Sequence, residues 1–131
     1  MLNGQNVLCI YQDGNIDSFL GAWVVWRNAL NASFIQHIEH TLPSDLEGRD
    51  VYILGPDIPL KSILPMANFC NRLVIFSTDE TFGSEVAEVE SSKPANVELI
   101  WGQNSALCNT VWTYFGMGVS APTLFTYVED R

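Results

Sequence analysis

The stretch Asn6-Val-Leu-Cys-Ile-Tyr11, followed by Gln12-Asp-Gly-Asn-Ile-Asp17, decides the fold. Its first half is a nearly continuous apolar run, which is typical of a strand covered on both faces in a parallel sheet. Its second half is a polar turn, and Asp17 with the following Ser18 offers an N-cap for a helix. The pair therefore predicts the first strand-to-helix step of an α/β domain.

The predicted helix after this turn is apolar over most of its circumference. Its large apolar residues recur at helical spacing: Phe19, Trp23, Trp26 and Leu30, with Leu20 and Val24 beside them. A helix that is apolar all round belongs in an interior, so we expect it to be buried and its tryptophans to pack in the core.

The rest of the chain repeats the alternation of strand and helix. Further strands are predicted at residues 33–38, 50–54, 72–76 and 97–101. Helices are predicted at residues 60–71, where Pro65 limits regularity, at 84–90, at 105–115 with Ser105 as a cap, and after Pro122. This alternation predicts one α/β domain over residues 1–131, with a doubly wound, mainly parallel five-stranded sheet and helices on both faces.

Polar side chains gather where the predicted strands end. In a parallel sheet these ends share one edge, where such folds bind ligands. Trp101 ends the last strand there, and its indole offers a surface on which a base can stack. The candidate site residues are Gln12, Asp13, Asp17, Asp57, Ser77, Thr78, Asp79, Trp101 and Asp130.

The amino-acid composition limits which partners this protein can bind and in which compartment we expect it. The 131 residues carry 15 acidic against 6 basic side chains, a formal charge of −9, so non-specific nucleic-acid binding is disfavoured. Cys9, Cys70 and Cys108 lie among apolar neighbours and in no C-x-x-C pair, which predicts buried, reduced thiols. Neither a signal peptide nor a membrane-spanning run is visible, so we expect a cytoplasmic protein without a membrane partner.

The polar turn resembles the first motif of the DHH-family metal-dependent phosphoesterases, which in one branch reads Y-H-G-N-C-A-D-G-F-G-A-A-W. Here the matching stretch is Tyr11-Gln-Asp-Gly-Asn-Ile-Asp-Ser-Phe-Leu-Gly-Ala-Trp23. Residues 46–53, 96–100 and 127–131 are also similar to family segments, in the same order along the chain. The resemblance implies the fold of that family's N-terminal domain, without its C-terminal substrate-binding domain.

Family members hold two divalent ions, usually Mn²⁺, through Asp and His ligands, and the ions activate a water that attacks a phosphodiester. In this chain the resemblance places Gln12 at the first-motif histidine and Gly55 at the second-motif aspartate. It places Ser77-Thr78-Asp79 at the family's Asp-His-His, so several ligands are replaced. Asp17 and Asp130 match acidic positions that are kept.

Two functions follow from this pattern. We expect a degenerate pseudo-phosphoesterase without a cofactor. It would bind a nucleotide or phosphate through helix N-termini and the hydroxyls of Ser77 and Thr78, or bind a protein partner, including a second copy of itself. A short acidic domain of this kind is typical of phage or mobile-element accessory proteins.

The alternative is a site rebuilt from carboxylates, in which Asp17, Asp57, Asp79 and Asp130 hold Mn²⁺ or Mg²⁺. Such an enzyme would hydrolyse short oligonucleotides or cyclic dinucleotides. A local reading also stands beside both functions: Asp17 caps its own helix, Asp57 and Asp79 bond loop amides, and Asp130 is a solvated residue.

Overall fold

Five apolar runs form one all-parallel sheet in the computed structural model, which describes residues 6–12, 16–29, 32–37, 47–56, 59–102 and 106–116, without the side chains of residues 36 and 37. The strand order is β2-β1-β3-β4-β5, and the predicted α/β class is confirmed. The strands are β1 (Val7–Gln12), β2 (Ser33–His37), β3 (Asp50–Leu54), β4 (Arg72–Ser77) and β5 (Val97–Trp101).

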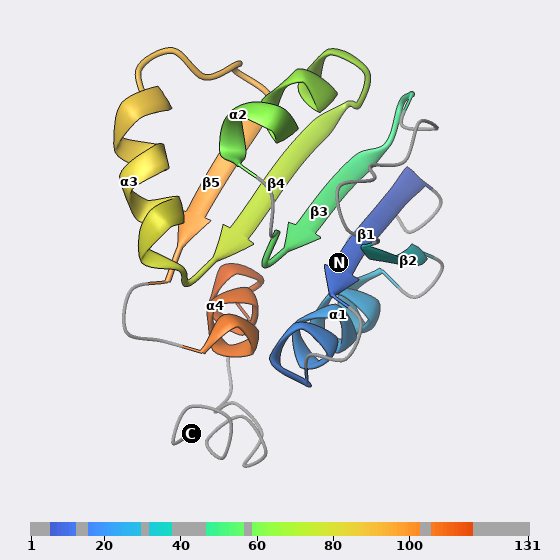
Figure 1. Cartoon of the computed structure of the whole chain (residues 1–131). Helices are drawn as coiled ribbons and strands as arrows, with labels where there is room; N and C mark the ends of the chain where they lie inside the picture. Colours follow the sequence, from blue (N-terminus) through green and yellow to red (C-terminus); the bar gives the residue numbers. More distant parts are fainter. Residues whose placement is uncertain are drawn as a thin grey trace.

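Helices cover both faces of the sheet (Figure 1). On one face α1 (Ile16–Asn28) lies beside α4 (Leu107–Tyr114). The other face carries α2 (Leu60–Ile63), a 3₁₀ turn η2 (Leu64–Asn68) and α3 (Glu80–Val89). This three-layer arrangement buries the strands on both sides, which is why their sequences are continuous apolar runs rather than alternating ones.

The core is divided by the sheet into two clusters, because successive strand residues point to opposite faces. Cys9, Tyr52 and Phe76 pack toward α1 and α4. Ile10 and Ile75 pack toward α2, η2 and α3. Every central strand therefore contributes to both layers.

Two predicted helices differ from the observed ones. The stretch expected as one helix over residues 60–71 is a single α-turn followed by η2, because Pro65 lacks the backbone N–H that a continuous helix needs. The helix expected over residues 84–90 begins at Glu80, since Asp79 caps it. The helix expected after Pro122 lies outside the described residues, as does Ser105.

The expectation that the first helix is buried is wrong for one of its faces. Leu20, Val24 and Val25 are buried against the sheet and α4. Phe19 and Trp26 on the opposite face are 57% and 47% exposed. In the part of the chain that the structure describes, every helix is too short or too polar to cross a membrane.

A polar cluster at the amino edge of the sheet ties α4 to the last two strands. The guanidinium of Arg72 donates to Glu98 and to the hydroxyl of Tyr114, and that hydroxyl donates to Oε2 of Glu98 at 3.2 Å. Burial raises the pKa of Tyr114 to about 12, so the hydroxyl keeps its proton at neutral pH. This cluster fixes the carboxyl end of α4 against the sheet.

Candidate functional site

The crevice beyond β1 and β3 is where the strand order reverses, and it is the usual ligand site of a doubly wound sheet. Here α1 enters that crevice. The hydroxyl of Ser18 accepts from the backbone N–H of Gln12 at 2.8 Å and donates to the carbonyl of Leu54 at 3.3 Å. Ser18 is fully buried. The Ser18 side chain thus joins the carboxyl ends of β1 and β3, the two strands between which a ligand would bind.

Asp17 caps a helix, but not the helix on which it stands. Its Oδ2 accepts from the N–H of Leu107 at 2.9 Å, and its Oδ1 accepts from the N–H of Cys108 at 2.7 Å. These are the first two residues of α4, whose own N-cap, Ala106, has no side chain that can accept. The local reading of Asp17 is therefore corrected: it caps α4 from across the site, because α1 already begins at Ile16.

Gly55 lies beside this cap in a conformation that favours glycine. Its φ is +64°, and a Cβ there would lie 3.1 Å from the Cδ2 of Leu107. Leu107 is itself buried. A side chain at Gly55 would therefore press against the Leu107 side chain of α4.

Ser77 is the last residue of β4, and Thr78 and Asp79 lead from it into α3. Ser77 is buried, and its hydroxyl accepts from the N–H of Asp79 at 3.1 Å. Asp79 is the N-cap of α3, since its Oδ1 accepts from the N–H of Thr81 at 3.2 Å. The hydroxyl of Ser77 and the carboxylate of Asp79 lie at the carboxyl edge of the sheet, as predicted. Both accept backbone N–H groups in the turn that leads into α3.

Glu85 provides a third carboxylate of the same kind. Its Oε2 accepts from the N–H of Leu60, the first residue of α2, at 2.9 Å. The sequence does not reveal this contact, because the two residues are 25 positions apart and no local capping pattern joins them. One or two N–H groups at the N-terminus of each of α2, α3 and α4 are therefore bonded by the protein's own carboxylates.

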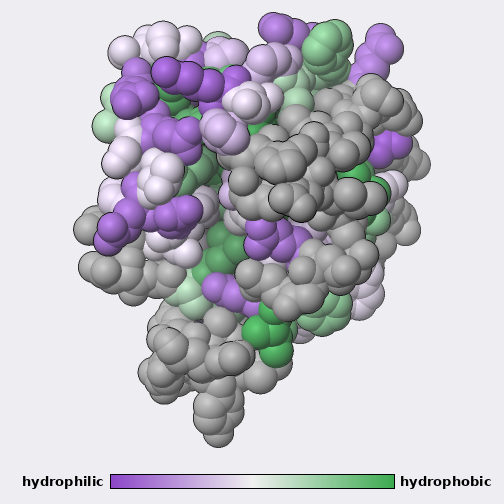
Figure 2. All heavy atoms as spheres, in the orientation of Figure 1, coloured by the Kyte–Doolittle hydropathy of each residue, from purple (hydrophilic) through white to green (hydrophobic). Residues whose placement is uncertain are grey.

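A cavity of about 240 Å³ lies between these turns. Its polar lining is acidic or uncharged. The exposed residues of α3 include Glu80 and Glu88, and the outer side of this helix is hydrophilic (Figure 2). A phosphate placed there would meet the carboxylates of Asp79 and Glu85, each of which already bonds an N–H group at a helix end. The lining residues are Pro56, Pro59, Ser77, Asp79, Thr81, Phe82 and Glu85.

Trp101 lies at the same edge, but one side of its indole is covered. A Cβ on Gly83 of α3 would lie 2.5 Å from the Cε2 and Cζ2 atoms of Trp101, so the ring packs directly on the helix backbone. The indole is 37% exposed. The packing of the Trp101 ring on α3 accounts for its position at this edge. Base stacking on Trp101 stays a prediction.

The described residues do not fit a two-metal centre. No group of three or more His, Cys, Asp or Glu side chains that could hold an ion occurs among them. Asp17 and Asp79 lie on different helix ends and bond backbone amides. The other predicted metal ligands, Asp57 and Asp130, and the candidate site residue Asp13 lie outside the described residues.

Cys108, next to Asp17, also offers no nucleophile. Burial raises the pKa of the Cys108 thiol, and the adjacent Asp17 carboxylate raises it further. The thiol is fully buried and protonated at neutral pH. Cys9 and Cys70 are likewise free and buried, as expected from the sequence.

A second hollow, which the sequence does not predict, lies beside α1 where this helix meets β1 and β2. It measures about 210 Å³ and is almost entirely apolar. The sequence predicts that Phe19, Trp23 and Trp26 are buried. It does not distinguish their exposure, because helical spacing alone does not say which face of an all-apolar helix meets the sheet. We call this hollow the α1 groove; its lining residues are Tyr11, Phe19, Ala22, Trp23, Trp26 and Phe34.

Comparisons with protein-family models, curated proteins and solved structures give no match to this chain.

Proposed function

We propose that this chain is a non-hydrolytic binding module that docks on a polypeptide through the α1 groove. The observation that carries the proposal is the exposed aromatic surface of α1, where Phe19 and Trp26 are about half exposed around an apolar hollow. Large exposed apolar patches on otherwise soluble domains mark interaction sites. Aromatic side chains are also the residues most enriched at the centres of protein interfaces.

The hydrogen bonds at the carboxyl edge of the sheet favour protein binding over nucleotide binding. Its three described carboxylates cap α2, α3 and α4, so a nucleotide phosphate would compete with charges that already stabilise the fold. The hydroxyl of Ser77 is likewise engaged in the turn. We therefore favour the protein-binding form of the module over the nucleotide-binding form.

We also propose that the domain is a degenerate relative of the DHH phosphoesterases. In that proposal Gly55 stands at the second-motif aspartate, and a Cβ there would lie 3.1 Å from the Cδ2 of Leu107. A positive φ at Gly55 adds strain for any replacement. A return to hydrolysis would therefore require the Leu107 side chain to shift as well as ligands to be restored.

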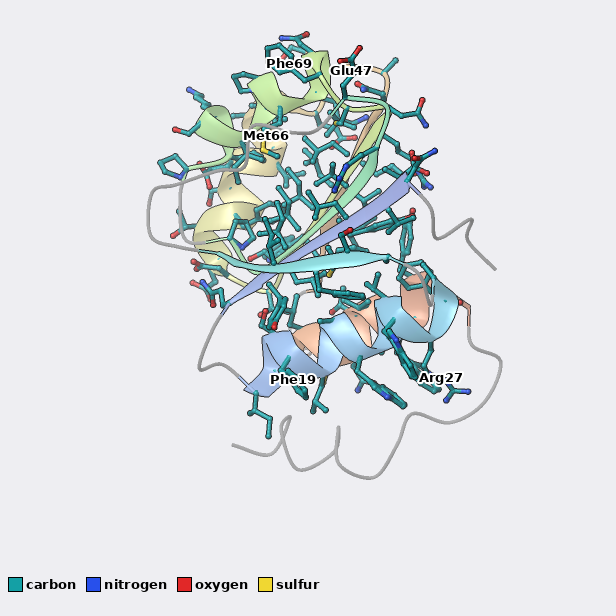
Figure 3. The ribbon with its side chains drawn as sticks, turned by 90° about the vertical axis from the view of Figure 1, so that its right-hand side faces the viewer. Phe19, Arg27, Glu47, Met66 and Phe69 are labelled. Atoms are coloured by element: carbon teal, nitrogen blue, oxygen red, sulfur yellow. The ribbon has the colours of Figure 1, made fainter. Side chains whose placement is uncertain are left out.

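The docking claim is tested with a phage-displayed library of helical peptides. The full-length chain is immobilised at low density, and binders are selected and then measured against variants. We expect the selected peptides to lose binding to Phe19→Asp and to keep it with Phe69→Asp. Phe69 is the matched control, because it is 64% exposed on the opposite side of the sheet from Phe19 (Figure 3). Peptides that bind both variants equally would contradict the assignment to α1.

The hydrolytic alternative is tested in the same preparation. Short oligonucleotides and cyclic dinucleotides are incubated with the chain and Mn²⁺ or Mg²⁺, and products are separated chromatographically. We expect no turnover above a heat-denatured control. Mn²⁺-dependent turnover that disappears in Asp17→Ala would establish an enzyme instead.

A further inference from the structure

One arginine lies beside the α1 groove. Arg27 is an exposed residue in the last turn of α1. Its guanidinium carbon is 5.3 Å from the centre of the Trp23 ring, and Trp23 lines the groove. A guanidinium at this distance is attracted to the electron-rich face of an indole, which limits where the cation can go. The structure therefore holds a positive charge next to an apolar hollow.

Arg27 has no carboxylate partner within the described part of the chain, although 15 acidic residues occur in the sequence. Two other cations show the usual arrangement. Lys61 pairs with Glu88 at 3.8 Å, and Arg72 pairs with Glu98. Arg27 differs from them in that the described residues leave its hydrogen-bond donors unused.

The acidic residue of the same helix does not neutralise Arg27. Asp17 lies in the first turn of α1, about 15 Å away along the helix axis. Both of its oxygens accept N–H groups of α4, from Leu107 and Cys108. The residues that line the groove are all uncharged. Among the described residues, Arg27 therefore sets the sign of the charge beside the groove.

The groove accepts one side chain rather than a whole helix. It lies where α1 meets the sheet, because Tyr11 of β1 and Phe34 of β2 complete its lining. On the α4 side, Trp23 is already stacked on Trp112, with ring centres 6.4 Å apart. The hollow measures about 210 Å³, and an apolar cavity of roughly 150 Å³ is large enough for a benzene ring. One aromatic or large aliphatic side chain therefore fits it.

We propose that Arg27 determines the specificity of the α1 groove, which binds a polypeptide segment carrying a carboxylate next to a large apolar side chain. The apolar side chain fills the hollow, and the carboxylate accepts from the guanidinium of Arg27. A guanidinium and a carboxylate match in planar geometry and form paired, charge-assisted hydrogen bonds. A lysine or arginine at the same place in the segment would meet a like charge. This inference rests on the proposed docking function and names the chemistry of its partner.

The overall charge of −9 does not cancel this preference. Exposed charges are largely screened beyond about 8 Å at physiological ionic strength, whereas a partly buried ion pair in contact is screened much less. The distant carboxylates therefore slow the approach of an acidic segment more than they weaken its bound state. The contact with Arg27 decides between an acidic segment and its neutral form.

The test starts from peptides selected on the wild type from the phage-displayed library. Each peptide is synthesised as selected, and again with the acidic residue beside its apolar side chain replaced by the corresponding amide. We expect most selected peptides to carry such an acidic residue. Arg27→Glu should weaken binding of the acidic form at least about tenfold, and the amide form should bind the wild type about tenfold more weakly. On Arg27→Glu the amide form should bind no more weakly than the acidic form.

Lys61→Glu is the matched control, because it changes an exposed cation of α2 by the same charge. It should leave the binding of both peptide forms unchanged. Arg27→Lys keeps a cation and should bind the acidic form with an affinity between those of the wild type and Arg27→Glu. Circular dichroism shows that every variant is folded.

Two results would overturn the inference. Selected peptides without an acidic residue, or acidic peptides that bind Arg27→Glu and the wild type alike, would show that Arg27 does not set the specificity. If such peptides still lose binding to Phe19→Asp, the docking function stands without it. Peptides that bind Phe19→Asp, Arg27→Glu and the wild type alike would refute both the docking site and its specificity.

Discussion

Asp17 shows how a single carboxylate can be mistaken for a ligand. Its position after the first strand and its place in a phosphoesterase-like motif both favour metal binding, yet both oxygens accept backbone N–H groups of α4. The partners are 90 and 91 residues away in the sequence. No local pattern in the sequence points to such a contact. The sequence therefore predicts that Asp17 lies at the sheet edge, but it cannot predict that Asp17 caps α4.

Replacing Asp17 tests this role at the scale of one residue. Asp17→Ala leaves the first amides of α4 without their acceptor, and we expect the free energy of unfolding to fall by about 2 kcal/mol. Asp17→Asn retains one accepting oxygen and should lose about half as much. Urea unfolding followed by circular dichroism measures both. An alanine variant as stable as the wild type would show that the cap is unimportant.

At the scale of elements, the apolar runs predicted the strands well. Two of them, β3 and β5, begin and end where expected, β2 and β4 differ by one residue at one end, and β1 is shifted by one residue at both ends. Strands buried on both faces leave a strong sequence signal, because nearly every position is apolar. The helices were harder: α3 was expected four residues late because its cap was not recognised, and α1 was expected to be covered on all sides.

The contact between α3 and β5 carries a prediction of its own. An alanine at Gly83 would place its Cβ 2.5 Å from the Trp101 indole, so the ring or the helix must move. We expect Gly83→Ala to lower the free energy of unfolding by about 1–2 kcal/mol, because the clash outweighs the helix propensity gained. The neighbouring, exposed Ser84→Ala is the control and should be neutral or slightly stabilising. If both variants gain stability alike, the packing of Trp101 on α3 is wrong.

At the scale of the whole molecule, the free energy of unfolding depends on pH, because the core buries cysteine thiols. Burial raises the pKa of Cys9 and is the main cause of the raised pKa of Cys108. In the unfolded chain a thiol has a pKa of about 8.5. Below that pH both states hold the proton and the stabilisation is complete. Above it the unfolded chain ionises first, so stability falls until the folded pKa is reached.

We therefore expect the free energy of unfolding to be level up to about pH 8 and to fall by about 2–4 kcal/mol near pH 10. Chemical denaturation at several pH values measures the slope, and Cys108→Ala should reduce it. In the same samples a thiol reagent should find no rapidly reacting cysteine in the folded chain and all three after unfolding. A slope unchanged by Cys108→Ala would assign the alkaline loss to other groups.

The central claim is that the carboxylates of the sheet edge act as helix caps and do not bind a metal or phosphate, and the proposed binding site is the α1 groove. The measurement that tests this most directly is the thermal stability of the wild type and of Asp17→Ala, each with and without millimolar Mn²⁺. We predict that the substitution lowers the unfolding temperature and that Mn²⁺ raises it for neither protein. A marked rise with Mn²⁺ in the wild type that is lost in Asp17→Ala would contradict the account and make that edge a metal site.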